Sequence, residues 1–85
     1  MLLILDAMDH DITKLVLARR LARTGEGKRL RERAELTIKE IAQAVGVDTG
    51  TIVRWETGRT SPRAPAALRW VDALHAVTDT SDGAA

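Results

Sequence analysis

Apolar residues recur at intervals of three and four positions along most of this chain, which is the spacing that gathers them on one face of an α-helix. Glycines and prolines interrupt the pattern, because glycine favours turns and helix ends and proline cannot continue a helix. The pattern therefore predicts an all-α fold, a small bundle of about five helices. The expected helices cover residues 6–24, 27–35, 37–45, 49–57 and 64–77.

The clearest local signals lie in the middle of the chain. Thr37 followed three positions later by Glu40 is a capping box, in which each side chain accepts the backbone amide of the other residue. Gly46 can take the positive φ that often ends a helix, and Asp48 is a good N-cap for a second helix that closes at Gly58. Two short helices joined by a three-residue turn are therefore expected.

The short turn forces these two helices to cross steeply and determines which faces meet. The inner side should pack through apolar residues, namely Ala42, Val45, Val47 and Ile52. The second helix also turns Trp55 and Glu56 inward, and it leaves small or polar residues outward, namely Thr49, Gly50, Val53, Arg54 and Thr57. This is the geometry of a helix-turn-helix, whose second helix fits the major groove of DNA, about 12 Å wide. A helical hairpin inside an ordinary all-α core would have the same spacing.

The sequence around these helices resembles the Xre/Cro-type helix-turn-helix family of bacterial and phage repressors. The resemblance covers about residues 27–77 and rests on Leu30, Arg31, Leu36, Thr37, Ala42, Gly46, Val47, Ile52, Trp55, Glu56, Gly58 and Pro62. Two positions depart from the family pattern. Ile38 replaces a glutamine that contacts the DNA backbone, so this contact is either missing or made by Lys39. Asp48 replaces a serine cap and brings a negative charge near the DNA.

The resemblance implies a lambda-repressor-like fold and a transcriptional repressor that binds double-stranded DNA sequence-specifically, with residues 49–57 in the major groove. The residues expected to face bases are Thr49, Gly50, Val53 and Arg54, and Arg54 is the strongest reader because a guanidinium can donate two hydrogen bonds to guanine. The residues expected at phosphates are Lys39, Thr51, Arg59, Thr60 and Arg63. The motif itself should be held together by Thr37, Glu40, Ala42, Gly46, Val47, Ile52 and Trp55, and by the pair that the family forms at the positions of Arg31 and Glu56.

The charge distribution agrees with a polyanionic partner. The net charge is only +1, yet residues 19–69 contain twelve Lys and Arg against six Asp and Glu, whereas both ends of the chain are net negative. The positive charge therefore lies on the motif, where DNA would bind. A mixed-charge surface of the kind that any small helical protein has is the alternative interpretation.

The segments on either side of the motif are expected to be an N-terminal helical extension, residues 1–24, and a disordered tail, residues 78–85, around a DNA-binding domain at residues 25–77. The N-terminal helix carries two apolar stripes, one through Met8, Ile12, Leu15, Arg19 and Ala22 and the other through Leu17 and Leu21. One stripe could meet the same helix of a second subunit, since repressors of this class bind two-fold sites as dimers, or both could be buried within one subunit. In the last helix the expected inner face consists of Leu68, Val71 and Leu74, with Trp70 on its flank.

Two alternatives stay open, one within DNA binding and one in another class of function. A MerR-like or excisionase-like module would suit the motif, but it would begin there and add a β-hairpin wing. A protein-interaction module, such as an antitoxin or adaptor that holds a toxin or polymerase, would use the N-terminal helix. No catalytic constellation, metal-ligand cluster or phosphate-binding loop is recognisable and cysteine is absent, so we expect no enzyme, metal or cofactor. No apolar segment is long enough to span a membrane, and a cytoplasmic protein of bacterial or phage origin is expected.

Overall fold

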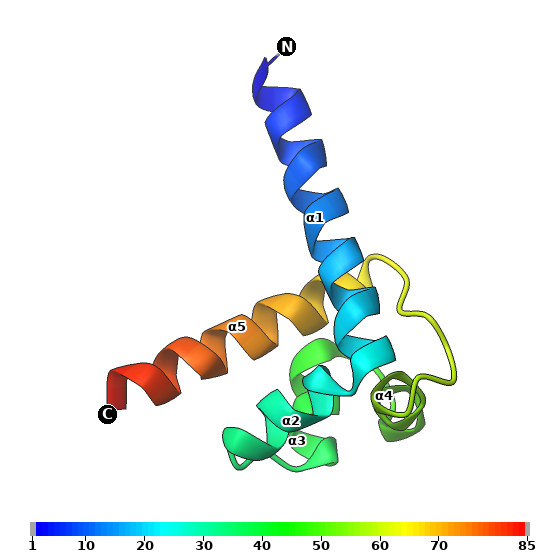
Figure 1. Ribbon diagram of the computed structural model, residues 1–85, viewed down its shortest axis with the longest axis vertical. Coiled ribbons are helices and arrows are strands. Elements are labelled where there is room, and N and C mark those ends of the chain that lie inside the picture. Colours follow the sequence, from blue (N-terminus) through cyan, green and yellow to red (C-terminus); the bar gives the residue numbers. More distant parts are fainter. Residues whose placement is uncertain (1, 85) are drawn as a thin grey trace.

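The computed structural model describes the backbone of residues 2–84 and the side chains of residues 10–78. Five helices follow one another along the chain (Figure 1), namely α1 (Leu2–Thr24), α2 (Glu26–Arg33), α3 (Ile38–Val45), α4 (Thr49–Glu56) and α5 (Ala66–Ala84). No strand occurs in this part of the chain, so the predicted all-α bundle is confirmed. A β-hairpin wing after the motif is contradicted, because an irregular loop and then α5 follow α4. None of the described helices is both long and apolar enough to cross a membrane.

The two long helices cover the three short ones. The second half of α1 and the first half of α5 lie against each other and against the short helices, whereas the first half of α1 projects away from the bundle (Figure 1). One buried cluster joins all of these elements except α2, and it consists of Ala18, Leu21, Ala22, Ile41, Ala42, Val45, Ile52, Trp55, Ala67, Trp70, Val71 and Leu74. The end of α1 is therefore part of the core, and only its beginning is an extension.

Local hydrogen bonds explain where the short helices begin and end. Thr37 Oγ1 accepts the amide of Glu40 at 3.0 Å and a Glu40 carboxylate oxygen accepts the amide of Thr37 at 2.9 Å, so the predicted capping box is confirmed. Gly46 ends α3 with a φ of 82°, a conformation that only glycine takes without strain. Asp48 Oδ1 accepts the amide of Thr51 at 2.6 Å and caps α4 as predicted.

Several helix boundaries differ from the predictions. The first helix begins at Leu2 instead of residue 6, and α2 ends at Arg33 because Glu35, with a φ of 60°, turns the chain toward α3. The last helix continues to Ala84, although a disordered tail was expected from residue 78. Once a helix is anchored in a core, each further residue adds a backbone hydrogen bond at little cost, and no proline interrupts this segment.

Trp70 lies at the centre of the core, so its predicted place on a flank is wrong. Its side chain is fully buried, whereas Leu68 is only partly buried. The indole lies against Gly27 of α2, where an added Cβ would be 2.6 Å from Cζ2 of the ring, and the glycine thus allows α2 and α5 to approach closely. The rings of Trp70 and Trp55 pack together with their centroids 4.9 Å apart. The chain has no Phe or Tyr, so these two tryptophans are the aromatic side chains of its core.

Candidate nucleic-acid interface

The inner face of α4 is anchored in the core. Ile52, Trp55 and Glu56 are all buried, which confirms the predicted orientation of this helix. The predicted apolar contact between the two motif helices is confirmed as well, since Ala42 and Val45 belong to the same buried cluster as Ile52. Because interiors are close-packed, this contact leaves α4 little freedom to rotate about its axis.

A buried ion pair holds the C-terminal end of α4. Arg31 Nε donates to one carboxylate oxygen of Glu56 at 2.6 Å and Nη2 donates to the other at 3.0 Å, so the pair implied by the family resemblance is present and bidentate. Arg31 Nη1 also donates to the carbonyl of Leu36 at 2.8 Å. The hydrogen bond to Glu56 raises the pKa of Arg31, and burial opposes this only in part. One guanidinium therefore connects α2, the turn before α3 and the end of α4.

The corner between α3 and α4 is fixed by backbone bonds and by one distant side chain. The amides of Gly46 and Val47 both donate to the carbonyl of Ala42, at 2.8 and 3.1 Å. Arg69 of α5 donates from Nε to the carbonyl of Val45 at 2.6 Å, so a cation closes the C-terminal end of α3, where the helix dipole favours positive charge. The role of Arg69 could not be predicted from the sequence, because a contact between residues 24 positions apart leaves no local pattern.

The outer face of α4 is open to solvent. Thr49, Arg54 and Thr57 are exposed, Gly50 is partly exposed, and the side chain of Val53 is 41% exposed even though it is apolar. All four residues expected to face bases therefore lie on the accessible side of the helix, together with Thr57. A helix with one side buried and the other side small, polar and uncovered can enter a groove without first unpacking from its own domain.

The guanidinium of Arg54 is directed back toward the start of α4. Its Nη2 donates to Thr51 Oγ1 at 3.1 Å and lies 3.9 Å from Asp48 Oδ1. The pKa of Asp48 is lowered by hydrogen bonding to the Thr51 side chain and amide, and to a smaller extent by the charge of Arg54. The carboxylate of Asp48, which departs from the family pattern, thus caps the helix and lies near the charge of Arg54.

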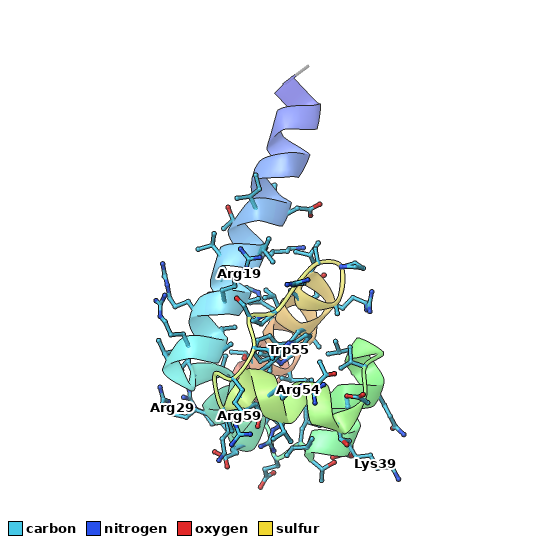
Figure 2. All side chains as sticks on the ribbon, turned by 90° about the vertical axis from the view of Figure 1, so that its right-hand side faces the viewer. Arg19, Arg29, Lys39, Arg54, Trp55 and Arg59 are labelled. Carbon is cyan, nitrogen blue, oxygen red and sulfur yellow. The ribbon has the colours of Figure 1, made fainter. Side chains whose placement is uncertain are left out.

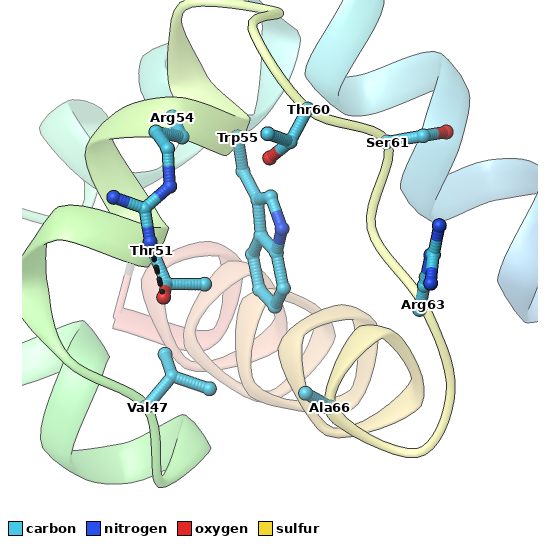
Figure 3. Close-up of a pocket in the computed structure, with 8 residues that line it drawn as sticks. All are labelled: Val47, Thr51, Arg54, Trp55, Thr60, Ser61, Arg63 and Ala66. Carbon is cyan, nitrogen blue, oxygen red and sulfur yellow. Dashed lines mark hydrogen bonds between the residues drawn. The ribbon is translucent and has the colours of Figure 1, made fainter.

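A groove runs between α4 and the loop that follows it (Figure 3). Its floor is apolar and its rim carries hydroxyls and guanidiniums, and the lining residues are Val47, Thr51, Arg54, Trp55, Thr60, Ser61, Arg63 and Ala66. The loop is anchored by Pro62, which is fully buried and whose carbonyl accepts Arg19 Nε at 3.3 Å. Thr60 and Arg63 are exposed on this anchored loop, as a contact to phosphate requires.

Cations lie on both sides of Arg54 in the view of Figure 2, with Arg59 on one side and Lys39 on the other. Both residues are exposed, and the amide of Arg59 donates to the carbonyl of Arg54 at 2.8 Å, which ties the start of the loop to the end of the helix. Exposed cations at such positions can contact the phosphates of a DNA backbone.

The family model that describes a helix-turn-helix domain matches residues 28–82, well over half of the chain. The chain belongs to this helix-turn-helix family. The match includes α2, both motif helices, the loop and nearly all of α5, in agreement with the resemblance to Xre/Cro-type proteins. No curated protein and no solved structure matches the chain. Helix-turn-helix domains bind DNA, so α4 and the surface around it are the candidate DNA interface.

Ile38, the other departure from the family pattern, lies next to this helix-turn-helix surface. It is partly buried against the core and lines a hollow between α2, α3 and α4 together with Lys28, Val53 and Thr57. An isoleucine cannot donate a hydrogen bond to phosphate. Two exposed donors remain near Ile38, namely Lys28, which lines the same hollow, and Lys39, the next residue along α3.

Proposed function

We propose that this helix-turn-helix protein is a sequence-specific transcriptional repressor that inserts α4 into the major groove of double-stranded DNA in a bacterial or phage-infected cell. One observation supports this proposal above the others: Thr49, Val53 and Arg54 are uncovered while the opposite side of the same helix is buried. No enzymatic role is proposed. The alternative of a purely structural helical hairpin would bury both sides of α4.

The proposed roles on α4 follow from side-chain chemistry. Arg54 reads guanine, because a guanidinium can donate to O6 and N7 of that base together. The methyl groups of Thr49 and Val53 contact thymine methyl groups, and Gly50 allows a close approach. The discrimination supplied by one bidentate pair is about 1–3 kcal/mol.

The proposed phosphate contacts set the register of the helix and carry no sequence information of their own. They come from Lys39 at the start of α3, from Thr51, and from Arg59, Thr60 and Arg63 on the loop. Each cation that neutralises a phosphate contributes to the salt dependence of binding, since it releases condensed counterions.

The test begins with selection of bound duplexes from a random library, followed by titration of the enriched duplex at several salt concentrations. Arg54→Ala should remove the preference at one base pair, whereas Arg59→Ala should weaken binding to all duplexes alike and flatten the salt dependence. Lys14→Ala is a charge-matched control, because Lys14 is paired with Asp72 of α5 at 3.0 Å and lies on a different part of the molecule. A uniform loss of affinity in both the Arg54 and Arg59 variants would show that Arg54 does not read a base.

We also propose that the repressor is a homodimer that associates through α1. The first half of this helix projects from the bundle (Figure 1), and two apolar side chains one turn apart are uncovered on it, Ile12 at 56% and Val16 at 49% exposure. A second copy of the helix would cover both residues. Dimers of this class bind half-sites about 34 Å apart, so the enriched duplex should have two-fold symmetry.

The exposed pair on α1 also supports a second candidate function, a protein-interaction module that holds a toxin or polymerase. Sedimentation equilibrium of the wild type and of Ile12→Lys with Val16→Lys distinguishes the two. A dimer that the double substitution converts to a monomer, with loss of affinity for the symmetric duplex, supports the repressor. A wild-type monomer that prefers no duplex supports the interaction module.

A further inference from the structure

The position of Arg54 depends on three residues around it at the start of α4. Thr51 Oγ1 accepts Nη2 of the guanidinium at 3.1 Å, and Asp48 Oδ1 lies 3.9 Å from the same nitrogen. The other terminal nitrogen, Nη1, lies over Gly50, where an added Cβ would be 3.2 Å from Nη1 and 3.9 Å from Cζ. The guanidinium therefore takes up the space that a side chain at position 50 would fill.

This arrangement limits the freedom of a long, flexible side chain. A guanidinium has five N–H donors, and the bond to Thr51 uses only one of them. Nη1 and Nε make no protein hydrogen bond within the described part of the chain, so they are available to acceptors outside the protein. Asp48 is held in turn, since its Oδ1 accepts the amide of Thr51 at 2.6 Å. The carboxylate therefore has a fixed position from which it can attract the cation.

We infer that Gly50 and Thr51 are specificity-determining positions of this domain because they place the Arg54 guanidinium over the first turn of α4, where it reads a guanine. This inference rests on the proposed function and extends it. Thr51 affects base preference through Arg54 and is in this respect a positioning residue, since its proposed contact to phosphate carries no sequence information. Gly50 determines which base pair Arg54 can reach. The Cβ of an alanine there would make the guanidinium shift by only a few tenths of an ångström, whereas a larger side chain would displace it away from the helix start.

The test compares base preference in single and double variants. For each protein, affinity is measured for the enriched duplex and for duplexes changed at one base pair at a time, and the ratio of the two affinities is the preference. At the pair read by Arg54 the wild-type ratio should be about tenfold or more. Replacing that guanine by 7-deazaguanine, which lacks the N7 acceptor, should weaken wild-type binding and leave binding by Arg54→Ala unchanged.

Gly50→Ala should reduce this preference in part and Gly50→Leu should reduce it to near one, as in Arg54→Ala. In the Arg54→Ala background, Gly50→Leu should change the preference at this pair no further. Thr51→Val removes the acceptor but keeps the shape of the side chain, so it should lower the preference, whereas Thr51→Ser should keep it. Melting followed by circular dichroism checks that each variant is folded. The small Gly50→Ala and Thr51→Ser changes keep the test possible if the leucine variant is unstable.

Each outcome decides between the roles. If Gly50→Leu weakens binding equally with and without Arg54, the glycine only permits close approach of the backbone to DNA, and the inference is wrong. Equal preferences in Thr51→Val and Thr51→Ser would also overturn it. A wild-type protein that prefers no duplex would refute the proposed function itself, and this result is visible before any variant is made.

Discussion

Breaking the buried pair of Arg31 and Glu56 should destabilise the protein more than any single substitution on its surface. Both side chains are almost completely buried, and two hydrogen bonds of 2.6 and 3.0 Å join them. Glu56→Leu removes the partner and leaves the guanidinium in the interior. Apart from its bonds to Glu56, the Arg31 guanidinium makes only one protein hydrogen bond among the described residues, to the carbonyl of Leu36.

The expected cost is large relative to the stability of such a small chain. Removing one member of a buried pair costs about 3–5 kcal/mol, because the remaining charge is left without compensation. A domain of this length is stable by about 4–13 kcal/mol in total. Replacing both members by Arg31→Met and Glu56→Leu should recover most of the loss, because no charge is then buried. The carbonyl of Leu36 still loses its donor, which costs about 1 kcal/mol.

Urea unfolding followed by circular dichroism measures these free energies, and the two single variants with the double variant form a complete cycle. Arg31→Lys is the conservative control: it keeps the charge but cannot reproduce the bidentate geometry, and it should fall between the wild type and Glu56→Leu. Because the pKa of Arg31 is raised in the folded protein, the contribution of its charge to stability is present at all pH values below about 12 and is lost only above that. The loss of unfolding free energy in Glu56→Leu should therefore be the same at about pH 6 and pH 9. A cost below 1 kcal/mol for Glu56→Leu would refute the reasoning.

Three further outcomes are expected. Gly27→Ala should lower stability by about 1–3 kcal/mol in urea unfolding, because the new methyl group would overlap the buried ring of Trp70, and Gly50→Ala on the exposed side of α4 should not. The pKa of Asp48 is lowered in the folded protein, so its carboxylate stabilises the fold above about pH 4 and this stabilisation is lost as the pH falls through the pKa of the folded state. In Asp48→Asn the Tm should therefore decline less steeply below about pH 4 than in the wild type. Arg69→Ala should cost about 1 kcal/mol in thermal unfolding by removing the bond to the carbonyl at the end of α3, and Arg69→Lys should restore part of it.

Features encoded by neighbouring residues could be predicted from the sequence. The capping box of Thr37 and Glu40, the turn at Gly46 and the cap at Asp48 each involve residues at most four positions apart. The spacing of residues along α4 likewise predicted which side of this helix faces the core and which side faces solvent. The pair of Arg31 and Glu56, which spans 25 positions, was expected only because the family resemblance implied it.

Features that depend on packing between distant segments could not be predicted. The central position of Trp70 depends on Gly27 of another helix, and the bond from Arg69 depends on how α5 crosses the end of α3. The extent of α1 and α5 was underestimated for a related reason. Their outer turns carry weak local signals and continue helices that are anchored elsewhere in the bundle.

The contacts that stabilise this small domain are also the ones that orient α4. Asp48 caps the start of the helix, Glu56 ties its end to α2, Arg69 closes the corner before it, and Ile52 anchors its inner side in the core. None of these four residues needs to touch DNA to affect recognition, because a displacement of about 1 Å is enough to misplace a side chain that donates two hydrogen bonds. Substitutions at these positions should therefore lower stability and base preference together. Substitutions at Arg54, Gly50 and Thr51 should change preference while stability stays nearly constant. This contrast separates Arg54 and the two residues that position its guanidinium from the residues that hold the reading helix in place.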